Sequence, residues 1–269
     1  MTDNREYLLF PISRGRLAFL LAGLAVLLSI MSLLANVAWI EHWPGAGTAL
    51  ALFSVDREMS VPTWWSAFVL AGLGVVAWAL AWTQAAGSRM DRLGWWSLAG
   101  GLMFLSADEI CMLHERLGGK IQVGGVMYHA RWILVWLLPA VIAAVGVFVC
   151  LWRLHRHVVI GMTLGILIYL AGAVGVETVN AAMRYDIEQR LQAPAEQTVD
   201  AHQSFVPLDW RRDRSYYPYV IGTTIEELLE MLGPVIWAWV LLDPRNRPRE
   251  DHTSAGGGRM KLHPTSSPP

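Results

Sequence analysis

Acidic side chains lie within stretches of this sequence that are otherwise apolar enough to cross a membrane. An ionisable residue inside the hydrocarbon core of a bilayer costs about 3 kcal/mol even on the most lenient insertion scale. We therefore expect these carboxyl groups to be protonated, paired, hydrated or bound to a metal ion. The acids within the apolar stretches are Asp108, Glu109, Glu177, Glu226, Glu227 and Glu230, and Glu115 stands near the end of one stretch.

Helical spacing places the acids of each stretch on one face. Successive residues of an α-helix are about 100° apart, so Glu226, Glu227 and Glu230 fall within an arc of about 100°. By the same count, Asp108 and Glu115 share one face of their own helix. In the topology described below, all of these acids lie between the midplane and the outer surface. Because lipid does not tolerate such faces, we expect them to turn toward a common interior.

The first of three interpretations is a metal site. Carboxylates from several helices, together with a histidine, resemble the ligand sets of di-iron helix bundles, although the Glu-x-x-His spacing of those bundles is absent. Oxygen ligands suit Mg, Mn or Ca, and a histidine extends the choice to Fe or Zn. A metal-dependent membrane enzyme or metal-binding protein with Fe, Mn or Zn is then expected. The candidate metal ligands are Asp108, His114, Glu115, Glu226 and Glu230, and the candidate acid/base groups are Glu109, Glu177 and Glu227.

Two other interpretations use the same acids. Carboxyl groups inside a helix bundle are the usual relay groups of proton- and ion-coupled transporters. The acids stop near the midplane, so a complete path would need water in the inner half. Alternatively, the acids pair with arginines and specify only helix packing, as in a structural or assembly protein. The available arginines are fewer than the acids, and they are Arg57, Arg116, Arg131 and Arg184.

The elements that must position these residues are transmembrane helices. The chain has 269 residues, of which 54% are hydrophobic and only 16% are charged. Several apolar runs reach the length of about 20 residues that a helix needs to cross a bilayer. We predict an all-α fold, with a single transmembrane bundle in residues 1–242, a long outer loop at 184–216 and a disordered tail at 243–269. About six spans are expected, at residues 16–40, 62–83, 93–117, 131–153, 157–183 and 217–242.

The arginines indicate how the bundle is oriented. Arg14, Arg89, Arg153 and Arg245 fall at the same end of the expected spans, and the positive-inside rule makes that end cytoplasmic. Both termini are then cytoplasmic, in a bacterial inner membrane, with the long loop outside. The net charge of −1 gives no sign of the basic face that nucleic-acid binding requires. The expected partners are membrane lipids, and the sequence identifies no protein partner.

Three groups of segments resemble motifs of an uncharacterised family of bacterial multi-pass membrane proteins. The resemblance covers most of the chain between Val55 and Gly233, and it implies that the acidic segments belong together. The family has no assigned activity, so the resemblance implies no catalytic role. The segments are Val55-Asp56-Arg57-Glu58 followed by Val61-Pro62-Thr63-Trp64, Leu105-Ser106-Ala107-Asp108-Glu109 with a downstream His114-Glu115, and Glu226-Glu227-Leu228-Leu229-Glu230-Met231-Leu232-Gly233.

Overall fold

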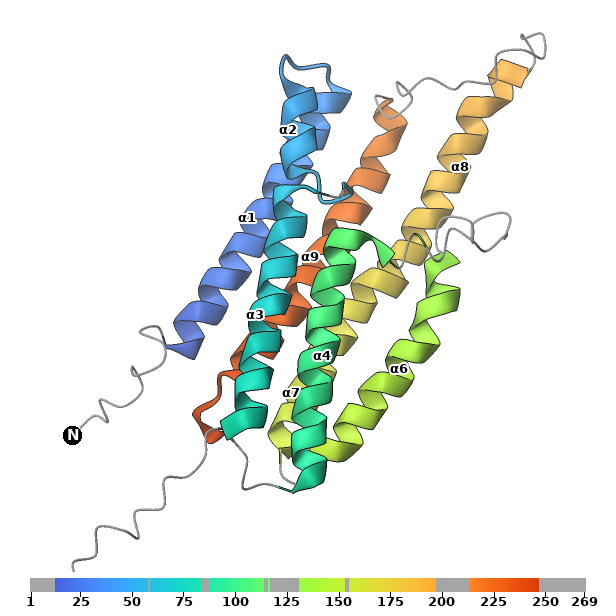
Figure 1. Ribbon diagram of the computed structural model, residues 1–269. Coiled ribbons are helices and arrows are strands. Elements are labelled where there is room, and N and C mark those ends of the chain that lie inside the picture. The colour runs from blue at the N-terminus through green and yellow to red at the C-terminus, as the bar shows by residue number, and fades with distance from the viewer. Residues whose placement is uncertain are drawn as a thin grey trace, which may run out of the picture.

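The computed structural model describes residues 13–57, 59–83, 88–113, 116, 131–152, 155–196 and 213–246. These residues form helices joined by turns, and none of them is in a strand, which confirms the all-α prediction. The long helices run side by side (Figure 1). Their bounds are α1 Arg14–Ile40, α2 Ala46–Phe53, α3 Val61–Thr83, α4 Arg89–Cys111, α6 Arg131–Leu151, α7 Arg156–Leu170, a π-helix Ala171–Val176, α8 Glu177–Glu196 and α9 Tyr217–Leu241.

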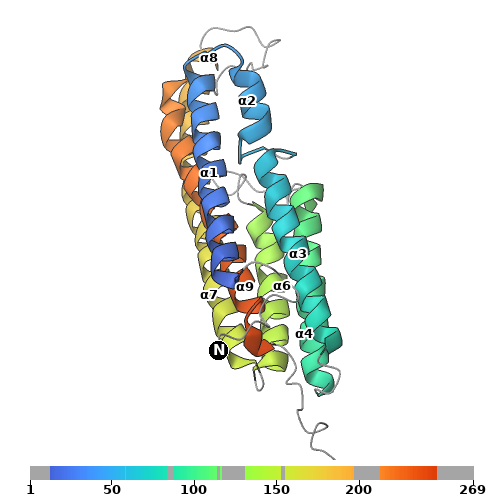
Figure 2. The ribbon, with the colours of Figure 1, turned by 90° about the vertical axis from the view of Figure 1, so that its left-hand side faces the viewer.

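Helix α9 occupies the centre of the bundle. It packs against α1, α3, α7, α8 and the π-helix. In the turned view, α3 and α4 lie on one side of the bundle, and α1, α7 and α9 lie on the other (Figure 2). The short helix α2 and the first turn of α9 lie at the same end of the molecule, which we name the α2 end. Any side chain on the inward face of α9 is therefore surrounded by other helices.

Three helical stretches are long and apolar enough to cross a membrane. They are α1, α3 and the continuous helix from Arg156 to Ile187, and they coincide with the predicted spans at 16–40, 62–83 and 157–183. Large apolar side chains also point outward: Phe19 is 79% exposed and Leu138 is 68% exposed. Exposed apolar surface of this kind is expected where lipid covers a protein. The full set of six spans and the cytoplasmic termini stay predictions.

Glycines allow α7 to approach α9 closely. A Cβ atom on Gly165 would lie 2.2 Å from Nε1 of Trp237, and one on Gly161 would lie 2.2 Å from a methyl group of Val240. The indole N–H of Trp237 donates to the carbonyl of Met162 at 3.1 Å. Small residues at such positions are the common means by which membrane helices pack at short distance. This contact holds α9 in place on the side of α7.

Helix α8 extends beyond the boundary that the sequence predicted. It continues to Glu196, well past residue 184, where the outer loop at 184–216 was expected to begin. No glycine or proline interrupts residues 177–193, and Asp186 forms an ion pair with Arg190 one turn later at 2.6 Å. The helix therefore continues because its local sequence supports it, even though its composition has become polar.

Two other boundaries differ from those expected. Helix α4 ends at Cys111, before the predicted residue 117, because Met112 adopts the left-handed conformation with φ 53°. At the other end of the molecule, residues 243–246 pack on the bundle, although the predicted disordered tail begins at 243. The fully buried Asn246 donates from Nδ2 to the carbonyls of Val240 at 2.9 Å and Leu241 at 3.1 Å. The rest of the predicted tail lies outside the described residues.

Candidate functional site

The centre of the candidate site is a contact between carboxyl groups of α8 and α9. Glu226 of α9 is only 7% exposed. Nδ2 of Asn180, on α8, donates to Oε2 of Glu226 at 2.5 Å. Glu177, almost one turn before Asn180, brings its carboxyl group next to that of Glu226. Two ionised carboxylates at such close range repel each other, so this contact favours a proton on one of the two carboxyl groups.

Two glycines give the helices the room to make this contact. A Cβ atom on Gly222 of α9 would lie 2.0 Å from Oδ1 of Asn180. A Cβ atom on Gly172 of the π-helix would lie 2.6 Å from the backbone carbonyl of Glu226. The π-helix itself widens one turn directly before Glu177, and such irregular turns are frequent at functional sites. Local backbone structure on both helices thus brings Glu177 and Asn180 onto Glu226.

Three further acids lie near this contact, Glu109 of α4 and Glu227 and Glu230 of α9. The hydroxyl of Tyr169, on α7, lies beside the carboxyl group of Glu230, and Tyr169 lies within electrostatic range of Glu109 and Glu227. Glu227 in turn interacts electrostatically with Glu230, Glu109 and Glu226, and also with Asp56 from the turn that precedes α3. The resulting set is named the carboxyl cluster, and its members are Glu109, Glu177, Glu226, Glu227 and Glu230.

The fold therefore brings together all three predicted acid/base residues and two of the predicted metal ligands. Asp108 lies half-buried near the end of α4. His114 and Glu115, the remaining predicted ligands, lie outside the described residues. Within the described part of the chain, no group of three or more His, Cys, Asp or Glu residues has an arrangement that could hold a metal ion. A metal site would thus depend on His114 and Glu115, and it stays a prediction.

Three polar residues near the cluster were not among the predicted site residues. Tyr219 and Thr223 precede Glu227 at intervals of four residues along α9, so all three share one helical face. This spacing could have identified Tyr219 and Thr223 as site residues from the sequence. Tyr169 was harder to identify, because a single hydroxyl in an apolar helix is a weak indication of a site. Only packing of α7 on α9 decides that this hydroxyl meets Glu230.

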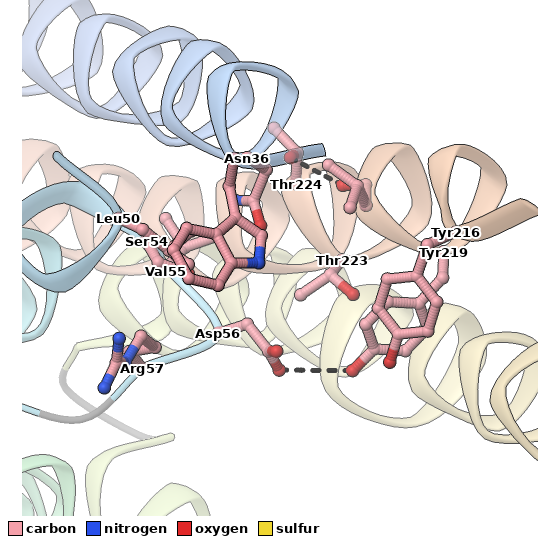
Figure 3. Close-up of a pocket in the computed structure, with 12 residues that line it drawn as sticks. Asn36, Leu50, Ser54, Val55, Asp56, Arg57, Tyr216, Tyr219, Thr223 and Thr224 are labelled. Carbon is pink, nitrogen blue, oxygen red and sulfur yellow. Dashed lines mark hydrogen bonds between the residues drawn. The ribbon is translucent and has the colours of Figure 1, made fainter. Parts of the chain in front are cut away.

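A small cavity, lined by both polar and apolar side chains, lies between α1, residues 54–57 and the first turns of α9, toward the α2 end (Figure 3). Its volume is about 30 Å³. The hydroxyl of Tyr219 donates to Oδ1 of Asp56 at 3.2 Å, and Thr223 and Thr224 also line the cavity. It is therefore separated from Glu226 and Glu227 by one turn of α9.

Ion pairs outside the apolar stretches hold the two ends of α9. At the α2 end, Arg214 donates to Oε2 of Glu41 at 2.7 Å and Tyr217 donates to Oε1 at 2.8 Å. These two donors, Arg214 foremost, lower the pKa of Glu41 below its ordinary value. At the opposite end, Arg245 and Arg14 pair with Asp243 and lower the pKa of its carboxyl group. The position of the cluster along the bundle is thus fixed from both ends.

An all-helical bundle with apolar helices of membrane length and acids turned inward is typical of helical membrane proteins. Residues 17–243 match the family described as Domain of unknown function (DUF8692), and the chain belongs to this family. The matched region contains the whole carboxyl cluster. The match confirms the resemblance to a family without an assigned activity. No curated protein and no solved structure matches the chain.

Proposed function

We propose that the chain is a multi-pass protein of a bacterial inner membrane, with six spans and both termini in the cytoplasm. The spans are α1, α3, α4, α6, the continuous α7–α8 helix and α9. Helices α1 and α4 begin, and α9 ends, at the end opposite α2 (Figure 1). Arg14, Arg89 and Arg245 stand at or next to these termini in the sequence, which supports a cytoplasmic location for that end under the positive-inside rule. The α2 end then faces the periplasm, and membrane lipids cover the exposed apolar side chains.

The carboxyl cluster acts in this proposal as the proton-binding site of a proton- or ion-coupled transporter. The observation that carries it is the close approach of the carboxyl groups of Glu226 and Glu177. Two such groups 
within a low-dielectric interior cannot both be ionised at close range, so the pair gains and loses a proton as a unit. A site that changes charge in this way is what a proton-coupled carrier requires.

A purely structural role for these acids has less support. Buried acids that only specify helix packing are expected to meet cations. Among the described residues, Glu226 instead accepts a hydrogen bond from the neutral Asn180 and lies next to the acidic Glu177. A second carboxyl group at this position adds the cost of like charges unless a proton is present. The arrangement is therefore better suited to binding a proton than to holding two helices together.

Flux through reconstituted protein tests the proposal. Proteoliposomes with a pH-sensitive dye inside would receive a potassium diffusion potential, with empty liposomes alongside. We expect proton movement in the wild type and its loss in Glu226→Gln and Glu177→Gln. Glu41→Gln, which changes an acid at the α2 end outside the cluster, should keep the flux. Wild-type vesicles that behave like empty liposomes, across a panel of imposed Na⁺, K⁺ and pH gradients, would sink the transporter proposal.

A metal-dependent membrane enzyme is the second candidate, and the observation that favours it is the convergence of carboxyl groups from α4, α8 and α9. Elemental mass spectrometry of the purified protein separates the two. Near-stoichiometric Fe, Mn or Zn in the wild type, lost in a folded Glu226→Gln/Glu230→Gln variant, would support the enzyme. No metal after incubation with each of these ions would remove it.

A further inference from the structure

The cavity at the α2 end has the size and the lining of a water site. Its volume of about 30 Å³ accommodates roughly two water molecules, since one needs about 10–15 Å³ on this measure. Asp56, Arg57 and Thr223 are among the side chains that line it. Water in a protein interior needs two to four polar partners. These groups supply an acceptor, a donor and a hydroxyl that does both.

One hydroxyl group in the lining would gain a hydrogen-bond partner from a water molecule in the cavity. Thr223 is 6% exposed, and its Oγ1 has no partner within hydrogen-bond distance in the part of the chain that the structure describes. The nearby hydroxyl of Tyr219 interacts with Thr223 electrostatically, but it donates its own hydrogen bond to Asp56. The neighbouring Thr224 also lines the cavity, but its hydroxyl donates to the carbonyl of Val220 at 2.7 Å. Buried polar atoms are rarely left unsatisfied, and ordered water is the usual remedy where the protein offers no partner. Thr223 therefore points to water within the cavity.

The cavity also lies beside the carboxyl cluster. Thr223 precedes Glu227 by four residues and Glu226 by three, so it occupies the adjacent turn on the same face of α9. Asp56 lines the cavity and interacts electrostatically with Glu227. Figure 3 shows the Thr223 side chain next to the hydrogen bond between Asp56 and Tyr219. A chain of polar groups thus leads from residues 54–57 to Glu227.

We propose that this cavity holds water and is the port through which the carboxyl cluster exchanges protons with the aqueous phase at the α2 end. The inference rests on the proposed function. A hydronium ion gives its proton to the Asp56 carboxylate and leaves as water. Water bound by Thr223 carries a proton onward to Glu227, and Asp56 is ionised again. Tyr219 orients Asp56 through its hydrogen bond.

Hydrogen–deuterium exchange of the protonated carboxyl groups tests the port. Full-length protein in lipid nanodiscs would be moved from H₂O to D₂O, and the infrared C=O band of its carboxylic acids followed with time. Glu226→Gln identifies the part of the band that belongs to the cluster. We expect the wild-type band to shift rapidly and Thr223→Val to slow the shift by about tenfold or more, as removal of a proton-transfer group does elsewhere. Thr223→Ser should exchange like the wild type.

Thr163→Val is the matched control, because Thr163 lies on α7 outside the cavity lining and its hydroxyl donates to the carbonyl of Val159, so the exchange should be unchanged. Asp56→Asn gives a second, independent test if Thr223→Val does not fold, and it too should slow the exchange. A band that shifts at the wild-type rate in the folded variants would overturn the port while leaving the protonated cluster intact. A wild-type spectrum without any carboxylic acid band that responds to Glu226→Gln would overturn the proposed function and the port with it.

Discussion

Asn180 on α8 donates a hydrogen bond from Nδ2 to Oε2 of Glu226 on α9 at 2.5 Å, and both side chains are buried. This contact joins two helices that are separated in the chain by residues 197–216. It also orients Glu226 toward the neighbouring carboxyl group of Glu177. The stability and the chemistry of the cluster therefore depend on the same amide group.

Removal of this amide should weaken the folded protein. Asn180→Ala leaves a buried carboxyl group without its donor, and we expect the free energy of unfolding to fall by about 2–3 kcal/mol. Thermal unfolding in mild detergent measures the change. Thr178→Ala is the matched control, because Thr178 is exposed on the same helix and its hydroxyl donates to the carbonyl of Val174 in the preceding turn. Equal melting temperatures for Asn180→Ala and Thr178→Ala would contradict the assigned role.

Gly222 should be intolerant of even a methyl group. Its added Cβ atom would lie 2.0 Å from Oδ1 of Asn180, so Gly222→Ala must displace Asn180 or separate α8 from α9. We expect a destabilisation of about 1–3 kcal/mol, as for other overpacked sites. Gly23→Ala, in the middle of α1, meets no atom within 4 Å and should be neutral or slightly stabilising. Chemical denaturation of both variants makes the comparison, and a neutral Gly222→Ala would show that the contact is looser than described.

Asp243 should anchor the end of α9 opposite α2. Its carboxyl group is 5% exposed and pairs with Arg245 and with Arg14 of α1. Asp243→Asn removes the charge from both pairs, and we expect a loss of about 2 kcal/mol, typical of hydrogen bonds to charged groups. Arg16→Gln, which changes a neighbouring arginine of α1, should have little effect. The prediction fails if the two variants unfold at the same temperature.

Acid should weaken the contact at the α2 end of the bundle. The Arg214 guanidinium and the Tyr217 hydroxyl lower the pKa of Glu41 below its ordinary value of 4.5. A group with a lowered folded pKa stabilises the protein above the unfolded value, and that stabilisation is lost as the pH falls through the folded value. We therefore expect the melting temperature to drop below about pH 4.5, and to drop less in Arg214→Gln than in the wild type.

Because Glu41 and Arg214 lie at the surface, the effect should be small and should shrink in high salt. Arg190→Gln provides the control, since its ion pair with Asp186 joins two exposed residues of one helix. Identical pH profiles for the wild type and Arg214→Gln would show that the Glu41 contact adds nothing to stability.

Local sequence determined the helices and the faces on which the acids lie. Apolar runs of membrane length predicted α1, α3 and α7–α8, because composition and length alone decide whether a helix is stable in lipid. Spacing along α9 placed Glu226, Glu227 and Glu230 on one face for the same local reason. The ends of helices were less well determined. Polar composition suggested a loop after residue 184, yet α8 continues to Glu196, because the lack of glycine and proline from 177 to 193 outweighs a change in polarity.

Only the tertiary structure decided which of these acids meet. The contact of Glu226 with Glu177 and Asn180 depends on the rotation and distance of α8 relative to α9, and these are set by close approach at Gly172 and Gly222. Helix packing admits several such arrangements for the same helical faces. The water-sized cavity beside Thr223 likewise forms between segments far apart in the chain. Spacing along one helix carries no information about either feature, because both arise from atoms contributed by different helices.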